Sequence, residues 1–386
     1  MDREELAGWL RLTLTTGVGN TTARKLLAAF GLPSGIFSQP FSALAQVVSQ
    51  AQATALGTLP PELPALLENT MNWLQPPAVD DTSFSQRRIV TLGDVLYPSA
   101  LLEMADPPLM LYLQGDPARV YESDRLIAIV GSRNPTAQGI TNARRFAVAL
   151  GQAGATIVSG LAIGIDGAAH EGALEASASD TRRLSTIAVV GTGLDRVYPK
   201  RHLDLARRIA RTGLLISEYP IGTPPLALNF PKRNRLIAAL SSATLVVEAA
   251  LQSGSLITAR LAAEMGRDVF AIPGSIHSTQ SRGCHALIQQ GAKLVESAQD
   301  VLEEMAWGGG AEVAVGTSAP HDGVPVMDGG DNDLLQALGY DPVGLDALQA
   351  RTGIDTPRLQ AQLMALELHG QVARLPGGLF QRIARA

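Results

Sequence analysis

Short apolar runs alternate with amphipathic stretches between residues 126 and about 305 of the chain. Each run is four or five residues long and almost wholly apolar, as expected for parallel strands that are covered by helices on both faces. The stretches between them, such as Gln138–Ala153 and Leu256–Met265, have the length of helices. The pattern predicts a doubly wound, Rossmann-like α/β sheet that is mostly parallel. Its predicted strands are Leu126–Val130, Thr156–Ser159, Thr186–Val190, Leu214–Ser217, Thr244–Glu248 and Val269–Ile272.

Residues 1–80 have the pattern of short helices and predict a helical domain of SAM or helix-hairpin-helix type. Two glycines within Leu14–Leu27 would allow a tight turn, and Asn20 or Thr21 is expected to cap the helix that follows. Such a hairpin can bind phosphates through its backbone amides. However, four basic residues face five acidic ones over residues 1 to about 75. A structural role is therefore favoured, with phosphate binding as the alternative.

The C-terminal part of the chain predicts a linker and one further domain. Residues 307–331 are rich in Gly, Ala, Val, Pro and Asp without periodicity, which is typical of a flexible linker. Residues 332–386 predict a winged-helix domain, with Val343–Thr352 and Pro357–His369 as its helix pair. The second helix carries only Arg358 and Glu367 as formal charges. It is therefore poorly suited to reading a major groove, and a protein contact or an accessory role is favoured.

Composition narrows the class of protein. No run of 18 apolar residues is present, and the first five residues are acidic rather than basic. A cytoplasmic protein without a membrane span is therefore expected. The single cysteine, Cys284, excludes an internal disulfide and a multi-cysteine zinc site, and is expected to be buried. The net charge of −5 is unusual for a nucleic-acid binder, but Arg182–Arg235 holds eleven Lys and Arg against three acidic residues.

Ligands of open α/β sheets bind beyond the carboxyl ends of the strands. After the first predicted strand, Gly131-Ser132-Arg133 combines small residues with a cation and predicts a phosphate cradle. A dinucleotide fingerprint, G-x-G-x-x-G, is absent there, and no cofactor is predicted. After the third strand, Lys200 and Arg201 add positive charge. After the fifth, Ser253-Gly254-Ser255 opens a helix and forms another predicted anion site.

The segment Asn229–Arg235 places Phe230 among three cations and two asparagines, although aromatic residues make up only 4% of the chain. A ring flanked by cations is how proteins hold single-stranded nucleic acid, because bases stack on the ring and the cations track the backbone. The alternative is a core phenylalanine with solvated cations. The predicted DNA-binding residues are Gly131, Ser132, Arg133, Gly160, Lys200, Arg201, Asn229, Phe230, Lys232, Arg233, Asn234, Ser253, Gly254 and Ser255.

No catalytic residue or metal ligand is predicted. Asp166 and His170 are four residues apart and share a helical face. They could form an acid–base pair, but a capping aspartate and an oriented histidine are favoured, because no third group of a triad lies near them in sequence.

Taken together, these segments resemble the DNA-processing protein A (DprA/Smf) family in their order and spacing. The resemblance covers residues 95–305 and rests on Gly131–Arg133, Ser159–Asp166 with His170, Gly191–Pro199, Phe230–Arg235, Ser253–Ala259 and Gly266–Gly274. Two positions depart from the family pattern. Gln138 stands where the family often has Tyr, which is expected to change only packing, and His285 stands where Asn is usual, which leaves the form of the dimer or partner surface open.

The resemblance implies a non-enzymatic protein that binds and protects incoming single-stranded DNA and helps to load RecA recombinase in natural transformation. It also implies a homodimer formed through the Rossmann-like domain, here residues 81–306. Arg133 would be the family's pocket arginine, and Lys200 the lysine after the Tyr-Pro step.

Two rival functions are weighed against this one. Glu248 with Ser253-Gly254-Ser255 could imitate the site of a Rossmann-type nucleotide phosphoribohydrolase, but the Pro-Gly-Gly-x-Gly-Thr loop of those enzymes is absent. A sequence-specific transcription factor would bind duplex DNA through the winged helix.

Overall fold

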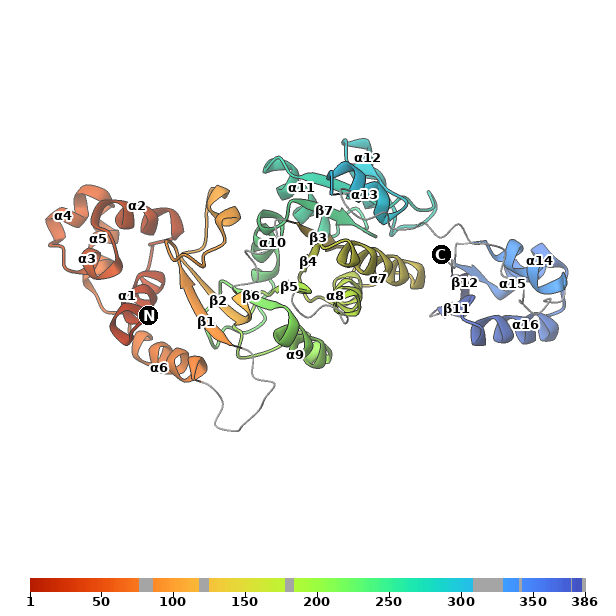
Figure 1. Ribbon diagram of the computed structural model, residues 1–386, viewed down its shortest axis with the longest axis horizontal. Helices are drawn as coiled ribbons and strands as arrows, with labels where there is room; N and C mark the ends of the chain where they lie inside the picture. The colour runs from red at the N-terminus through yellow and green to blue at the C-terminus, as the bar shows by residue number, and fades with distance from the viewer. Residues whose placement is uncertain are drawn as a thin grey trace.

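The computed structural model describes residues 1–75, 86–117, 125–177, 184–307, 329–339, 342–375 and 377–383. A mixed α/β domain forms its centre, with a helical module on the N-terminal side and a winged-helix module on the C-terminal side (Figure 1). The predicted fold class is therefore confirmed. The predicted linker at 307–331 lies almost entirely outside the described residues, and the predicted domain boundaries stay predictions.

The central sheet has nine strands within the described residues, in the order β1-β2-β6-β5-β4-β3-β7-β8-β9. Strand β2 pairs antiparallel with β1 and β6, and all the other pairs are parallel. The strands are β1 (Arg87–Thr91), β2 (Met110–Gly115), β3 (Leu126–Val130), β4 (Thr156–Ser159), β5 (Thr186–Val189), β6 (Leu214–Ser217), β7 (Ala243–Val246), β8 (Asp268–Ala271) and β9 (Lys293–Leu294).

The six strands predicted from apolar runs are β3 to β8, with ends displaced by at most two residues. Strands β1, β2 and β9 were not predicted. Strand β1 begins with two arginines and β9 is only two residues long, so neither has the apolar run of a buried parallel strand.

The order of the strands reverses beside β3. The chain passes from β3 through β4 and β5 to β6, then returns and places β7 on the other side of β3. The connections that follow β3 and β7 therefore leave the sheet in opposite directions and open a crevice between them. Such a switch point is where open α/β sheets bind ligands.

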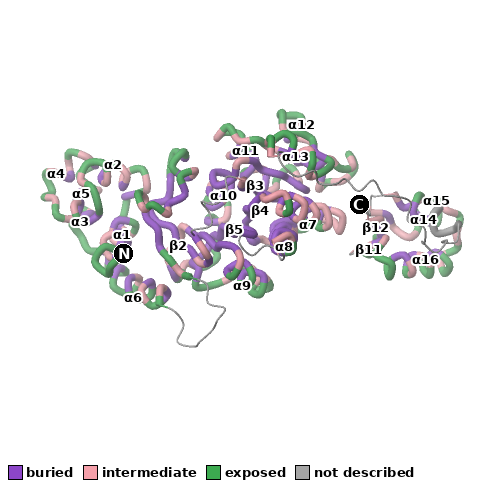
Figure 2. Tube along the Cα trace, in the orientation of Figure 1, coloured by how far each residue is buried: buried purple, intermediate pink, exposed green. Residues whose placement is uncertain are grey.

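Helices cover both faces of the sheet, as the apolar runs predicted. Ile127 and Ile129 of β3 pack on one face, against α7 (Ala137–Gln152), α8 (Ile165–Ala176) and α13 (Ala298–Glu304). Ala128 and Val130 pack on the other, against α10 (Asn229–Leu240), α11 (Ser255–Glu264) and α12 (Arg282–Gln289). The core strands are buried accordingly (Figure 2).

The remaining helices of the central domain are α9 (Leu203–Thr212) and the short 3-10 helices η1 (Ser99–Glu103) and η3 (Lys200–His202). Cys284 of α12 is buried, as expected, and burial raises the pKa of its thiol to about 12.

The N-terminal module packs on the β1–β2 edge of the sheet. The Trp73 ring lies edge-on to Tyr112 of β2, with 6.0 Å between the ring centroids. Its helices are α1 (Arg3–Leu14), α2 (Asn20–Phe30), α3 (Pro33–Phe37), α4 (Phe41–Val47), α5 (Gln50–Gly57) and α6 (Leu63–Leu74).

The predicted cap of α2 is wrong. Gly19 occupies the cap position and Asn20 is already helical. The Asn20 side chain instead donates to Asp106 Oδ2 at 3.4 Å, and Arg24 donates to the Ala105 carbonyl at 3.1 Å. Both polar groups of the hairpin thus hold the N-terminal module to the central domain, which supports the structural interpretation.

The winged-helix module contains a three-stranded sheet in the order β10-β12-β11. Val343 and Gly344, expected to begin a helix, form β10 because they pair with Phe380 and Leu379. The elements are α14 (Gly329–Leu338), β10 (Val343–Gly344), α15 (Leu345–Thr352), α16 (Thr356–Leu368), β11 (Val372–Leu375) and β12 (Leu379–Arg382). Within the described parts of the chain, no helix has the length and apolar character needed to cross a bilayer.

Candidate nucleic-acid interface

A pocket of about 720 Å³ lies at the switch point, beyond the carboxyl ends of β3 and β7. It brings together the predicted segments after β3, at the start of α10 and before α11. Of the predicted residues, those that line it are Gly131, Ser132, Arg133, Phe230, Arg233, Asn234, Ser253, Gly254 and Ser255. The pocket thus combines nine of the fourteen residues that the sequence pattern assigned to a single site.

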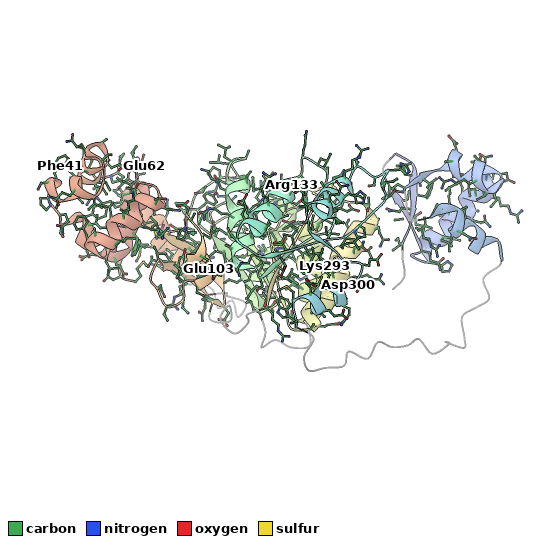
Figure 3. All side chains as sticks on the ribbon, turned by 90° about the horizontal axis from the view of Figure 1, so that it is seen from above. Phe41, Glu62, Glu103, Arg133, Lys293 and Asp300 are labelled. Atoms are coloured by element: carbon green, nitrogen blue, oxygen red, sulfur yellow. The ribbon has the colours of Figure 1, made fainter. Side chains whose placement is uncertain are left out.

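An aromatic and cationic cluster forms one wall of this pocket. The Arg133 guanidinium lies 5.7 Å from the centroid of the Phe230 ring, within cation–π range. The ring of Tyr198, which is 50% exposed, lies 5.5 Å from that of Phe230. Arg133 is exposed at the surface of the central domain (Figure 3). The cluster therefore offers a ring face and a positive charge to solvent side by side.

Tyr198 was not among the predicted site residues, although its segment was noted. It follows the Gly191-Thr192-Gly193 turn after β5 and precedes Lys200 by two residues. In a chain that is only 4% aromatic, a tyrosine beside a cation after a strand is the same signal that singled out Phe230.

Arg233 was predicted to bind DNA, but its side chain is buried. It is only 3% exposed, and its Nη1 donates to the carbonyls of Gly160, at 2.7 Å, and of Val189. Its helix, α10, begins at Asn229, so the segment predicted as a binding loop is helical and turns Arg233 inward. Arg233 therefore forms the floor of the pocket and joins the ends of β4 and β5, rather than meeting a phosphate at the rim.

A buried carboxylate balances Arg233. Asp166 accepts hydrogen bonds from the backbone amides of Gly160, at 3.1 Å, and Ala162, at 3.3 Å. Burial raises the pKa of Asp166, and the charge of Arg233 opposes that rise. Burial likewise lowers the pKa of Arg233, to about 10, against the effect of Asp166. A carboxylate so engaged positions the loop after β4. The prediction that Asp166 caps a helix is wrong, because Gly164 is the N-cap of α8 and no side chain caps that helix.

Gly160 and Asn229 are also structural. A Cβ atom on Gly160 would lie 2.3 Å from Arg233 Nη1, so only glycine leaves room for the guanidinium. Asn229 is buried and donates to the Gly191 carbonyl at 3.1 Å, which ties the start of α10 to the turn after β5. Neither residue lines the pocket.

Glu248, the acid of the rival hydrolase reading, caps α7. One carboxylate oxygen accepts from the Thr136 hydroxyl at 2.6 Å and the other from the Thr136 amide at 2.9 Å. Burial raises the pKa of Glu248, and the hydrogen bonds to Thr136 oppose the rise. Because both oxygens are held at a helix N-terminus, the geometry favours a structural role over an acid in catalysis.

Fewer cations are available near the pocket than the eleven Lys and Arg counted in Arg182–Arg235. Arg196, Arg207, Arg208 and Arg235 form ion pairs with Asp195, Asp204, Glu171 and Glu218. Arg182 and Arg183 lie outside the described residues. The exposed cations near the pocket are Arg133, Lys200, Arg201 and Lys232, here called the cationic rim. Lys200, Arg201 and Lys232 do not line the pocket itself.

His170, the predicted partner of Asp166 on α8, is part of the core. His170 is fully buried, and its Nδ1 lies 2.7 Å from the Thr186 hydroxyl. Burial is the main cause that lowers the pKa of His170, to about 3. It is thus an oriented, neutral histidine, as the sequence analysis favoured, and it lies 16 positions from its partner in sequence.

This fold and pocket define a Rossmann-like α/β protein with an aromatic, cationic site at its switch point. The sequence model of DNA recombination-mediator protein A matches residues 88–306, and that of the DprA winged helix domain matches residues 319–378. The chain belongs to the DNA recombination-mediator protein A family.

Relatives and solved structures agree with this assignment. The chain is 39% identical to Protein Smf of Escherichia coli over 83% of this chain and 82% of that protein. It is 32% identical to Protein Smf of Synechocystis over 99% and 100% of the two chains. The solved DNA processing protein A of Streptococcus pneumoniae matches with a TM-score of 0.60 and 36% identity, over 79% of this chain and 98% of that one.

A second solved structure, DNA processing protein A from Helicobacter pylori, matches with a TM-score of 0.51 and 32% identity, over 57% of this chain and 96% of that one. Its published description concerns the single-stranded DNA binding mode of that protein.

The first prediction tests the floor of the pocket. Gly160→Ala should lower the free energy of unfolding by about 3 kcal/mol, because the added methyl group displaces a buried guanidinium from its acceptors. Gly254→Ala is the matched control, since a Cβ there meets nothing within 4 Å, and it should cost less than about 1 kcal/mol. Urea denaturation followed by circular dichroism measures both; equal losses in the two variants would contradict the role given to Gly160.

The second prediction concerns pH. His170 has a pKa of about 3 in the folded protein, below its ordinary value of 6.5, so the unfolded chain takes up the proton first as pH falls. The stabilisation is present above pH 6.5 and is lost as pH falls toward 3, by up to about 1.4 kcal/mol per pH unit. His170→Gln should flatten this part of the stability–pH curve between about pH 6.5 and 5. Parallel curves for the two proteins would show that His170 is not buried in its neutral form.

Proposed function

We propose that this protein binds single-stranded DNA at the switch-point pocket and does so without catalysing a reaction. The observation that carries the proposal is the cluster of Arg133, Tyr198 and Phe230, in which two rings and a cation share one exposed wall. Bases can stack on such rings for about 1–3 kcal/mol each, whereas a paired base has no free face to offer.

The electrostatics favour an extended anion. Arg133 of the cationic rim lines a pocket that also presents the Ser253 and Ser255 hydroxyls. The two hydroxyl oxygens lie 2.7 Å apart at the start of α11, where the helix dipole favours negative charge. Because the whole chain carries a net charge of −5, duplex DNA would be repelled by the rest of the surface, and a strand that fits the pocket would still be held.

The protein's wider role would be to protect incoming single strands and to help load RecA recombinase in natural transformation, which places it in the cytoplasm. The description of its family as recombination mediators and the single-stranded DNA binding described for the Helicobacter pylori relative support this role. Single-stranded DNA would thus be shared between this protein and the recombinase.

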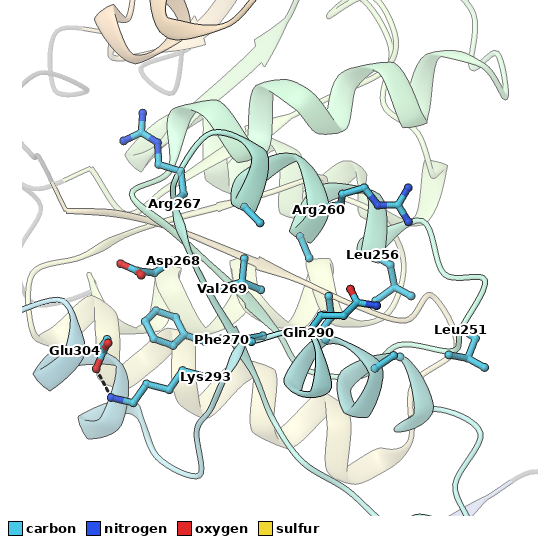
Figure 4. A pocket seen from close by; sticks show the side chains of 17 residues that line it. Leu251, Leu256, Arg260, Arg267, Asp268, Val269, Phe270, Gln290, Lys293 and Glu304 are labelled. Atoms are coloured by element: carbon cyan, nitrogen blue, oxygen red, sulfur yellow. Dashed lines mark hydrogen bonds and ion pairs between the residues drawn. The ribbon is translucent and has the colours of Figure 1, made fainter.

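A homodimer through the Rossmann-like domain is part of the proposal. A pocket of about 490 Å³ lies between α11, α12 and β8, and Figure 4 shows Leu251 and Leu256 on one side of it and the Lys293–Glu304 ion pair on the other. Leu294 of β9, the short edge strand that also supplies Lys293, is exposed, as is Leu251 of the pocket lining. Exposed apolar groups beside an open sheet edge are suited to contact a second subunit.

The winged helix fits a protein contact better than duplex recognition. Met364 and Leu368 of α16 are 65% and 81% exposed, and they occupy the surface that would enter a major groove. Apolar side chains in that position offer few groups to pair with base edges. A transcription factor that uses this helix is therefore not favoured.

The third prediction separates charge from stacking. Arg133→Glu should weaken binding of oligothymidylate at least tenfold at about 50 mM salt and reduce the salt dependence. Phe230→Ala should weaken binding by about 1–3 kcal/mol with an unchanged salt dependence, because stacking releases no counterions. Fluorescence anisotropy at about 50 and 200 mM salt measures both.

Arg211→Glu is the control for that experiment. Arg211 is exposed in the last turn of α9 and lines neither pocket, so reversal of its charge should change affinity less than Arg133→Glu does. Equal affinity of the wild type and the Arg133→Glu protein would remove the basis for the proposed site.

A further inference from the structure

A second pocket, of about 440 Å³, adjoins the switch-point pocket. The two share a wall, because Arg133 and Asn134 line both. The far side of the second pocket is formed by η3, which contributes Arg201 and His202, and by α9, which contributes Leu205 and Arg208. We refer to it as the η3 pocket.

Two of the three arginines that line the η3 pocket can bind an anion, because they form no ion pair with the described part of the protein. Arg133 and Arg201 are exposed, and within the described residues neither is held in an ion pair. The third arginine there, Arg208, is neutralised by Glu171 at 2.7 Å. Asp204 also lines the pocket and pairs with Arg207 at 3.5 Å. Two guanidinium groups without an ion pair to a described residue thus line one pocket, an arrangement that suits successive phosphates of one strand.

The η3 pocket is also lined by the flat imidazole ring of His202. His202 Nδ1 lies 3.0 Å from the Leu161 carbonyl, which fixes the imidazole ring. The ring lies against the first turn of α8, where a Cβ on Gly167 would be 2.9 Å from its Cε1 atom. Ile140 of α7 is exposed and adds an apolar wall. An imidazole and an apolar side chain between two cations repeat the chemistry of the switch-point pocket.

We propose that the η3 pocket is a second nucleotide subsite, which extends the strand held in the switch-point pocket. The strand would cross the shared wall with one phosphate on Arg133 and place its next phosphate on Arg201. The intervening base or sugar would lie against Ile140 and His202. This inference rests on the proposed function, because it assumes an unpaired strand in the first pocket. A volume at the lower end of the range of ligand pockets, about 300–1,000 Å³, fits a single nucleotide and not a duplex.

The test compares oligothymidylates of about 4 and about 16 nucleotides, bound to the full-length chain. Arg201→Ala should weaken binding of the longer oligonucleotide about five- to tenfold at about 50 mM salt and lower the salt slope by about one. Binding of the shorter one should change less than about twofold, because the switch-point pocket alone can hold it. Ile140→Asp, which places an anion in the same pocket without touching Arg201, should have the same length-dependent effect.

Arg211→Ala is the matched control. Arg211 is exposed in the last turn of α9 and lines neither pocket, so this change removes the same charge as Arg201→Ala without altering either pocket, and binding of both oligonucleotides should stay nearly unchanged. Equal losses for Arg201→Ala and Arg211→Ala, or equal losses for the two lengths, would overturn the second subsite and leave the first pocket intact. Absence of binding by the wild type at both lengths would instead overturn the proposed function together with this inference.

Discussion

A buried guanidinium holds this site together. Arg233 donates to the carbonyls of Gly160 and Val189, at the ends of two neighbouring strands, and its charge is balanced by Asp166. A charge this deep is costly unless it is paired and hydrogen-bonded, so these partners fix α10 against the sheet. Phe230, three residues earlier on the same helix, is placed beside Arg133 as a consequence. The exposed cluster therefore depends on a residue that is itself buried.

The sequence predicts the parallel part of the fold well, because a strand that is buried on both faces appears in the sequence as a run of apolar residues. Strands β3 to β8 are short apolar runs, and their register places the loops that follow them at one edge of the sheet. The edge strands β1 and β9 have no such apolar run. Strand β1 begins with Arg87 and Arg88, and its position is fixed by pairing with β2, a long-range contact that local periodicity does not contain.

The sequence predicts where the site lies, but not which of its side chains are exposed and which are buried. Gly131–Arg133, Phe230 and Ser253–Ser255 meet as their places after the strands suggested. Sequence cannot tell an arginine that faces solvent from one that faces the core, because the two differ only in helical phase. One helical step separates exposed Lys232 from buried Arg233. The same uncertainty affects Asn229, whose amide donates to the Gly191 carbonyl. Tyr198 joins the site through its contact with Phe230, 32 positions further along the chain, and a contact at that separation is not contained in the local sequence.

The central claim is that an unpaired strand lies on the rings of Tyr198 and Phe230. Photo-cross-linking of the full-length protein to an oligonucleotide with a photoreactive thymine analogue tests it directly, since such bases react with aromatic side chains on which they stack. Mass spectrometry of the cross-linked peptides should locate the adducts at Tyr198 or Phe230, and unlabelled single strands should compete better than duplex. Adducts found instead in α16 or in the helices α1 to α6 would contradict the account.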